Sequence, residues 1–281
     1  MGEVTPLRTR FLVLTRYGFS DVWSSRITNI LFAMCFLPTV IGLVMIYVMN
    51  SDVAKLLLGA QNIRGLTIDQ RFFFGVMQSQ CWLALILTAW IGPRLISADM
   101  SDNALPILLS RPITRWEYVL GKLIVLWTML SAVTWAPLLL LWGFQAYNAK
   151  QPWAAANLFI AGGMVAGSLI WVALLSLVAL ALSSWVKWRV VGTGLIFGAI
   201  FIPAGVGGVF NAVMRTDKGF LLNIPFMMTI LWHRLLRVPA LFFEQRVSLS
   251  LPEISIALAL MCAACVLVLH RRIRAREVVR G

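Results

Sequence analysis

The sequence predicts an all-α integral membrane protein with six transmembrane helices, and three observations lead to this fold class. Of the 281 residues, 60% are hydrophobic and only 12% are charged, whereas soluble domains contain roughly 45–50% apolar residues. Six segments provide the about 20 largely apolar residues that a helix needs to cross a bilayer. Lysines and arginines gather at alternate boundaries of these segments, which is typical of spans held in one orientation.

The six predicted spans are long apolar runs. They cover residues 27–49, 73–92, 123–147, 155–183, 190–210 and 253–270. A seventh apolar stretch, 220–243, contains Arg234 and Arg237 near its centre, and a central arginine costs about 2.5–3.5 kcal/mol in a spanning helix. Two prolines also interrupt it. We therefore interpret the stretch as an interfacial or re-entrant helix pair within an extracytoplasmic loop of residues 211–252.

The distribution of basic residues gives the expected orientation. With the amino terminus in the cytoplasm, most of the 24 lysines and arginines fall on the inner side, including the basic tail after the last span. A seventh span would move this tail outside, against the positive-inside tendency. No cleavable signal precedes the first span, so we expect that span to remain as an anchor. We expect both termini in the cytoplasm and a location in the plasma membrane, the inner membrane in a bacterium.

The segment before the first span, residues 1–26, has the pattern of an amphipathic helix. Apolar or small residues fall near one helical face, with Arg16 and Arg26 elsewhere. The residues on that face are Leu12, Thr15, Phe19, Val22 and Trp23. We expect this helix to lie on the inner leaflet; the alternative is a disordered basic leader.

Composition and motifs argue against several classes of function. The formal net charge is +13, but no basic stripe lies on a soluble segment, so we expect no nucleic-acid partner. No segment between spans is longer than 211–252, which leaves no room for a catalytic domain of the usual size. No P-loop sequence G-x-x-x-x-G-K-[ST] occurs. All 11 acidic residues fall in loops or at span ends, so a proton relay within the membrane has no ionisable groups to use.

Histidines and cysteines give no catalytic or metal site. His233 and His270 are the only histidines, and they lie far apart in the sequence. Cys262 and Cys265 have the spacing of a metal or redox pair, but all four cysteines fall within apolar runs. We interpret the cysteines as small packing residues. The sequence therefore predicts a chain that is not an enzyme and holds no cofactor or metal of its own.

The polar and small residues within the spans are expected to hold helices together. The strongest polar groups are three glutamines, for which we predict interhelical hydrogen bonds worth about 0.6–2 kcal/mol each. They are Gln78, Gln80 and Gln145. Gly163 and Gly167, and likewise Gly194 and Gly198, have the spacing that lets helix backbones approach closely. We interpret both pairs as packing sites.

A structured polar stretch, ADMSDNALPILLSRPITRWEYVLGK, separates the second and third predicted spans. Asn103 can cap a short helix, and an Arg-Pro pair ends that helix because the residue before proline avoids the α region. Thr114 and Glu117 then form the T-x-x-E pattern of a capping box, which begins the helix of the third span. Two helices are thus predicted to meet at a sharp cytoplasmic corner. We interpret the corner as a docking site; the alternative is a capped hairpin without a partner.

This stretch resembles the region between the second and third spans of ABC-2 type transporter permeases. In that family an acidic segment leads into an LSRP-[IL]-[ST]-R-x-E-Y-x-x-GK run, and the resemblance here extends from Asp99 to Lys122. The six-span layout and the amphipathic N-terminal segment agree with the same family along the whole chain. The absence of a P-loop agrees as well, because ATP hydrolysis in this family often belongs to a separate subunit.

The resemblance implies particular roles for several segments. Residues 1–281 would form a single transmembrane permease domain with an elbow helix in 1–26. Within the cytoplasmic segment 93–122, a coupling helix at 103–110 would dock on an ABC ATPase subunit, which would hold ATP and Mg. The residues implied in ATPase coupling are Asp99, Asp102, Arg111, Arg115 and Glu117.

The function expected from the resemblance is that of a non-catalytic permease subunit of an ATP-driven exporter. Its partners would be the ATPase subunit, a second identical or paralogous permease and membrane lipids. Apolar, aromatic-rich spans favour a lipid-like or amphipathic substrate over small ions. Two alternatives remain: an energy-independent membrane scaffold or assembly protein, and a channel or secondary carrier.

Overall fold

The computed structural model describes residues 10–51, 68–101, 115–149, 152–186, 188–238 and 249–275. All regular secondary structure within these ranges is helical. The elements are α1 (Arg10–Trp23), α2 (Arg26–Met34), α3 (Leu37–Asn50), α5 (Gln70–Ser101), α7 (Arg115–Val133), α8 (Trp135–Asn148), α9 (Trp153–Ala156), α10 (Leu158–Ser183), α11 (Arg189–Met214), the 3₁₀ turn η2 (Lys218–Leu222), α12 (Ile224–Leu235) and α13 (Leu251–Ala275).

Six helical segments are long and apolar enough to cross a membrane, which identifies an integral membrane protein. They are Arg26–Asn50, Gln70–Leu95, Trp116–Asn148, Leu158–Ser183, Arg189–Met214 and Leu251–Arg271. Each overlaps one of the six predicted spans, with boundaries that differ by several residues. The prediction of an all-α, six-span membrane protein is confirmed.

Two of the spans consist of two helices each, and a proline explains each break. α2 ends at Met34, one turn before Pro38, and α7 ends at Val133, one turn before Pro137. Proline has no N–H to donate to the carbonyl four residues earlier, and its ring collides with that carbonyl. The predicted spans did not include these breaks.

In contrast, α5 continues through Pro93 because a neighbouring helix satisfies the carbonyl that this proline leaves without its helical partner. That carbonyl belongs to Ala89, and the Thr193 hydroxyl of α11 donates a 2.9 Å hydrogen bond to it. Neighbouring helices and Thr side chains commonly satisfy such groups in membrane proteins. Gly192 of α11 lies close to the proline ring, since a Cβ at Gly192 would be 2.9 Å from Pro93 Cβ. α11 therefore packs closely against α5 at Pro93.

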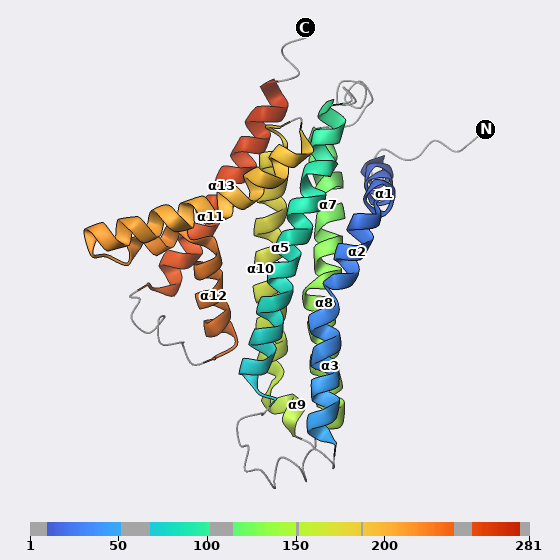
Figure 1. Ribbon diagram of the computed structural model, residues 1–281, viewed down its shortest axis with the longest axis vertical. Coiled ribbons are helices and arrows are strands. Elements are labelled where there is room, and N and C mark those ends of the chain that lie inside the picture. Colours follow the sequence, from blue (N-terminus) through green and yellow to red (C-terminus); the bar gives the residue numbers. More distant parts are fainter. Residues whose placement is uncertain are drawn as a thin grey trace, which may run out of the picture.

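The long helices α5 and α10 lie side by side along the centre of the molecule (Figure 1). The span of α2 and α3 and the span of α7 and α8 pack on one side of this pair, whereas α11, α12 and α13 lie on the other (Figure 1). α1 and the carboxyl end of α13 lie at the same end of the molecule, as an even number of spans requires. α11 leaves the bundle obliquely from that end.

The glycine pair on α10 brings α12 close to the bundle, as predicted for this spacing. A Cβ at Gly163 would lie 2.9 Å from the Leu235 carbonyl oxygen, and a Cβ at Gly167 would lie 2.7 Å from Trp232 Cδ1. The Trp232 indole N–H donates a 3.2 Å hydrogen bond to the Gly167 carbonyl. A larger residue at either glycine would push α12 away.

The equivalent prediction for α11 is wrong within this chain. A Cβ at Gly194 would meet no atom within 4 Å, and one at Gly198 would meet only Ile202 of its own helix. The physical reason is the oblique course of α11, which leaves this glycine face without a packing neighbour among the described residues.

Two of the three predicted glutamines form interhelical hydrogen bonds. The Gln80 amide of α5 donates to the Thr39 hydroxyl of α3, and the Asn50 amide of α3 donates a 3.0 Å bond to Gln145 Oε1 of α8. Both glutamines are buried. Gln78 forms no hydrogen bond to another described residue. The first span is therefore held to α5 and α8 by polar contacts as well as by packing.

The seventh apolar stretch forms a short helix and not a span. α12 contains 12 residues, about 18 Å at 1.5 Å per residue, which is too short to cross the hydrocarbon core. Its N-cap Asn223 accepts a 3.1 Å bond from Phe226 N–H, and its buried face packs into the bundle against α10. The described part of the predicted helix pair thus contains η2 and α12; residues 239–248 lie outside the described residues.

Candidate functional site

The predicted docking corner lies at the end of the molecule where α5 ends and α7 begins (Figure 1). The expected coupling helix at 103–110 lies outside the described residues, as do Asp102 and Arg111. Asp99 falls on α5 and Arg115 is the first residue of α7, but their side chains also lie outside the described part.

Glu117 is the predicted site residue whose side chain is described. It is half-buried in the first turn of α7, where a carboxylate interacts favourably with the positive end of the helix dipole. Thr114, the first residue of the T-x-x-E pattern, lies outside the described residues, so the capping box stays a prediction. The docking role of this corner stays a prediction.

The segment predicted to be an amphipathic helix forms α1, which packs against the beginning of α7. Thr15 and Val22 of α1 are buried, and a Cβ at Gly18 would lie 2.9 Å from Val125 Cγ2 of α7. The Thr15 hydroxyl donates a 3.4 Å hydrogen bond to the Gly121 carbonyl. One face of α1 is therefore fixed to α7.

The predicted apolar face of α1 differs from the observed one at its end. Trp23 is 43% exposed, and its ring packs edge-on against Phe32 of α2 at a centroid distance of 4.9 Å. The chain turns from α1 into α2 directly after Trp23, so this residue faces the following helix instead of α7.

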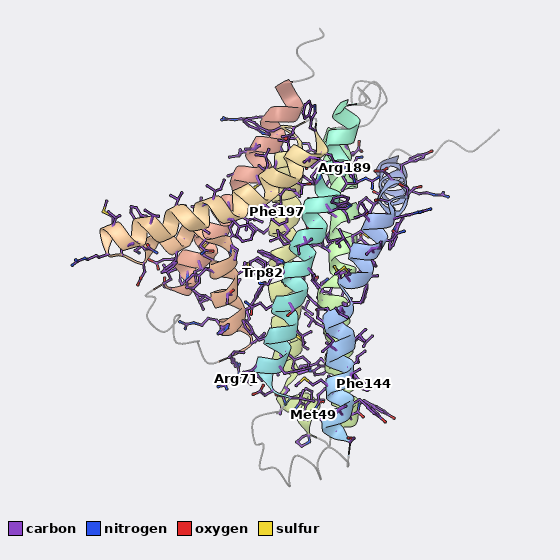
Figure 2. All side chains as sticks on the ribbon, in the orientation of Figure 1. Met49, Arg71, Trp82, Phe144, Arg189 and Phe197 are labelled. Carbon is purple, nitrogen blue, oxygen red and sulfur yellow. The ribbon has the colours of Figure 1, made fainter. Side chains whose placement is uncertain are left out.

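A charged cluster links α1, α5 and α11 at this end of the molecule. Asp21 of α1 forms an ion pair with Arg94 of α5, with an O–N distance of 3.5 Å. Arg189, at the start of α11, places its guanidinium 5.3 Å from the centre of the Trp90 ring of α5, which is within the range of a cation–π interaction. Figure 2 shows Arg189 near the end of the bundle where α11 begins.

We call the contact region between α5 and α11 the Pro93 joint, and define it by six residues. They are Ala89, Trp90 and Pro93 of α5 and Arg189, Gly192 and Thr193 of α11. α10 closes the joint from a third side, because a Cβ at Gly92 would lie 2.7 Å from Ala179 Cβ. The joint is thus a close three-helix contact, and it lies beside the Asp21–Arg94 ion pair.

The amino-acid sequence contains only a weak signal for these contacts. Arg94 and Arg189 belong to the basic residues expected on the inner side, and Asp21 belongs to the acidic residues expected in loops or at span ends. The proline inside α5 and the Gly-Thr pair on α11 are residue types that favour close helix contacts. Their contact with each other depends on which helices lie next to each other.

The amino end of α7 also contacts α13. The Trp116 ring stacks on His270, near the end of α13, with a centroid distance of 5.5 Å and an interplanar angle of 20°. Lys122 and Tyr118 in the same part of α7 are almost fully buried, with the Lys122 ammonium 5.7 Å from the Tyr118 ring centre. The beginning of α7 therefore touches both α1 and α13.

Aromatic side chains line the space between α5 and α11 beyond the Pro93 joint. Trp82 of α5 stacks on Phe201 of α11 with an interplanar angle of 6° and a centroid distance of 6.2 Å. Phe201 also stacks on Phe197. Trp82 is 37% exposed and Phe201 47% exposed, so these rings present an apolar surface outside the protein core; Figure 2 labels Trp82 and Phe197.

The described residues contain no group of three or more His, Cys, Asp or Glu side chains that could hold a metal ion. Cys262 and Cys265 are partly buried on one helix and form no disulfide. His233 is buried against Phe74 on α5, with ring centroids 4.1 Å apart. Burial lowers the pKa of His233, which favours the neutral imidazole. These residues pack between helices.

A comparison of the sequence with protein-family models and with curated proteins found no match to either.

Proposed function

We propose that this chain is the permease subunit of an ATP-binding-cassette exporter of the ABC-2 type. One observation carries the proposal: the stretch from Asp99 to Lys122 resembles the ATPase-docking region of that family. The six apolar spans support it. The chain would form a single permease domain, pair with a second identical or paralogous permease, and bind separate ATPase subunits that hold ATP and Mg.

The contacts of α7 support a coupling role for the corner before it. A movement of the corner would reach the amino end of α7 directly, because the two are adjacent in sequence. From α7 it would pass to α1 through the Thr15–Gly121 hydrogen bond and to α13 through the Trp116–His270 stack. The Asp21–Arg94 pair would pass it on to α5, beside the Pro93 joint. A rigid helix with several partners suits the transmission of a displacement.

The orientation in this proposal places the amino end of α7 in the cytoplasm. Arg94, Arg189 and Arg271 lie at that end of their spans, which agrees with the positive-inside tendency. α1 and the end of α13 would then both be cytoplasmic, and the loop 211–252 with α12 would belong to the outer half. The membrane would be the plasma membrane, the inner membrane in a bacterium.

The aromatic residues between α5 and α11 support a lipid-like or amphipathic substrate. Trp82 and Phe201 are half-exposed and stacked on each other, and such surfaces favour apolar molecules over hydrated ions. A tilt of α11 at the Pro93 joint would change the spacing of these rings. Opening and closing of this aromatic surface would accompany the ATPase cycle.

The proposal is tested by recovering the partner. The tagged chain is purified from its native membranes in a mild detergent, and co-purifying proteins and ATP hydrolysis are measured for wild type, Glu117→Ala, Arg115→Ala and Arg234→Ala. Arg234 is an exposed arginine on α12, away from the corner, and serves as the control. We expect an ATPase subunit with wild type and Arg234→Ala. Its recovery should fall about tenfold or more in the other two, because a lost charge-assisted contact costs about 1.5–3 kcal/mol.

The outcomes separate the proposal from its alternatives. Equal thermal stability of all four proteins would show that the loss is not caused by misfolding. A folded wild-type protein that recovers no ATPase would contradict the proposal and favour a membrane scaffold.

A further inference from the structure

An apolar groove separates the first span from α5, on a part of the molecule that the proposed function does not use. Its volume is about 450 Å³, within the range of about 300–1,000 Å³ typical of small-molecule sites. The lining residues come from two sides. α2 and α3 contribute Met34, Leu37, Pro38, Ile41, Gly42 and Met45, and α5 contributes Arg71, Phe72, Gly75, Val76, Ser79 and Leu83.

Two glycines give the groove its depth. Gly42 is buried at its floor, where a Cβ would lie 3.1 Å from Leu141 Cδ2 and 3.6 Å from Phe72 Cζ. Gly75 is exposed on the opposite wall, and a Cβ there would meet no atom within 4 Å. Leu37 and Ile41 are more than half exposed and form the rim.

The groove has the length of one leaflet. On α5 it extends from Arg71 to Leu83, about 18 Å at 1.5 Å per residue. Half of a hydrocarbon core of about 30 Å is about 15 Å. α5 and α3 are both spans, so the groove opens towards the acyl chains of the bilayer.

An apolar groove of this kind does not hold water. Ordered water needs two or more polar partners, and the Ser79 hydroxyl already donates a 2.9 Å bond to the Gly75 carbonyl. An empty groove would forfeit dispersion contacts along its whole length. A flexible hydrocarbon chain fits both the shape and the polarity of this space.

One end of the groove carries a positive charge. Arg71 lies in the first turn of α5, its side chain is exposed, and it forms no ion pair with an acidic side chain among the described residues. The nearby Asp69 carboxylate caps α5 by accepting bonds from the N–H groups of Arg71 and Phe72, at 3.0 and 3.3 Å. Because Arg71 begins the span, its guanidinium lies at the level of lipid headgroups, where it can bind a phosphate with two hydrogen bonds.

We propose that the groove binds one acyl chain of a resident anionic phospholipid, whose phosphate contacts Arg71. The charge complementarity of Arg71 selects the headgroup, and the glycine-lined wall accommodates the chain. The bound lipid fills the space between the first span and α5 in the leaflet that contains Arg71. The proposal does not depend on the ATPase partner.

The test measures retained lipid on the whole chain. Each protein is purified in a mild detergent with equal amounts of phosphatidylglycerol and phosphatidylcholine of the same acyl chains, and bound lipids are counted by native mass spectrometry. Gly75→Leu adds bulk to the groove wall at a position where a Cβ meets no atom within 4 Å, and Ser79→Leu is a second filling variant. Gly143→Leu on α8 is the matched control, because Gly143 is exposed and a Cβ there also meets no atom within 4 Å. Arg71→Gln removes the charge, with Arg234→Gln as its control.

We expect wild type and both controls to retain phosphatidylglycerol in preference to phosphatidylcholine. Both filling variants should lose the bound lipid at unchanged thermal stability, and Arg71→Gln should lose the preference between headgroups. Inorganic phosphate added alone should not displace the lipid. Equal retention in Gly75→Leu and wild type, no headgroup preference in wild type, or displacement by inorganic phosphate would overturn the proposal. A loss of dimer in Gly75→Leu without a loss of lipid would also overturn it and assign the groove to a second copy.

Discussion

Two glycine pairs with the same spacing behave differently in this molecule. Gly163 and Gly167 of α10 lie within van der Waals distance of α12, whereas Gly194 and Gly198 of α11 face a surface without a neighbouring helix among the described residues. The local sequence pattern is the same in both helices, so the difference comes from the positions of the helices. A small-residue pair permits close packing, but it does not decide whether a partner is present.

The same contrast holds for the whole helices. In the most apolar part of α10, 61% of the residues are buried, but only 22% in α11 and 11% in α13. α10 packs against α5, α7, α8, α12 and α13, so it forms the centre of the fold. α11 and α13 instead turn most of their apolar surface outwards, which in a membrane is covered by lipid or by another chain. The molecule thus consists of a buried centre and a more exposed pair, α11 and α13.

Each helix of this exposed pair packs against one central helix, α11 against α5 and α13 against α10. At one end α11 is fixed to α5 at the Pro93 joint. At the other end Lys218 of η2 forms a 2.6 Å ion pair with Glu253 of α13, and the Asn211 side chain of α11 accepts a 2.6 Å bond from Gly219 N–H. α11 and α13 are thus linked to each other through η2, and each also packs against a helix of the centre.

The largest loss of stability is expected when leucine replaces the buried Gly167. In Gly167→Leu the new Cβ would lie 2.7 Å from Trp232 Cδ1 and 2.8 Å from Met77 Cε, so α12 must move. Overpacking of this kind costs about 1–3 kcal/mol or more. The matched control is Gly194→Leu, which has open space on α11. Thermal unfolding in detergent, followed by tryptophan fluorescence, should show a lower melting temperature for the first variant alone. Equal stability of the two variants would show that α10 and α11 do not differ in packing.

A smaller effect is expected for the polar contact between α3 and the centre. The Gln80 amide donates to the Thr39 hydroxyl, and both side chains are buried. A double-mutant cycle with Gln80→Leu and Thr39→Val should give a coupling energy of about 0.6–2 kcal/mol, the range for hydrogen bonds between membrane helices. Gln78→Leu is the control, because Gln78 forms no hydrogen bond to a described residue. Additive effects of the two substitutions would contradict the assigned contact.

The next smaller loss of stability is expected from removing the hydrogen bond at the Pro93 joint. Thr193→Val keeps the shape of the side chain but removes the donor to the Ala89 carbonyl, which Pro93 leaves without its helical partner. The expected cost is about 1 kcal/mol. In Pro93→Ala the Ala89 carbonyl regains a helical N–H donor. Thr193→Val should therefore lower the free energy of unfolding less in that background. A cost that is equal with and without Pro93 would show that the hydroxyl does not compensate for the proline.

These contacts show which parts of the fold could be predicted from the sequence. The spans were predictable because hydropathy and length alone define them, and the short α12 was predictable because Arg234 and the prolines exclude a spanning helix. The breaks after Met34 and Val133 follow from prolines. The same rule applied to α5 would have predicted a break at Ala89, where Thr193 of another helix prevents it.

The contacts at the candidate site depend on tertiary structure. Glu117 could be predicted as a site residue from the sequence because the T-x-x-E pattern is local. The pairing of Asp21 with Arg94 joins residues of α1 and α5 that are far apart in the chain, so no local pattern specifies it. The same holds for the glycines: Gly167 is buried and Gly194 is exposed because a helix packs against the first and no described helix packs against the second.

The smallest effect is expected for the ion pair between α1 and α5. Asp21 is 52% exposed and Arg94 is 14% exposed, and ion pairs with exposed partners contribute only about 0–1 kcal/mol. Asp21→Asn should therefore lower the stability slightly at low ionic strength and have almost no effect at 1 M salt, where the Debye length is about 3 Å. Thermal unfolding at both salt concentrations measures this difference, with Arg94→Gln and the double variant completing the cycle. If α1 transmits movement to α5 through this pair, Asp21→Asn should reduce the proposed ATP-driven activity more than it reduces stability, because the pair then fixes the relative position of the two helices. Unchanged activity together with a salt-independent stability would show that the ion pair has no role and that α1 only packs against α7.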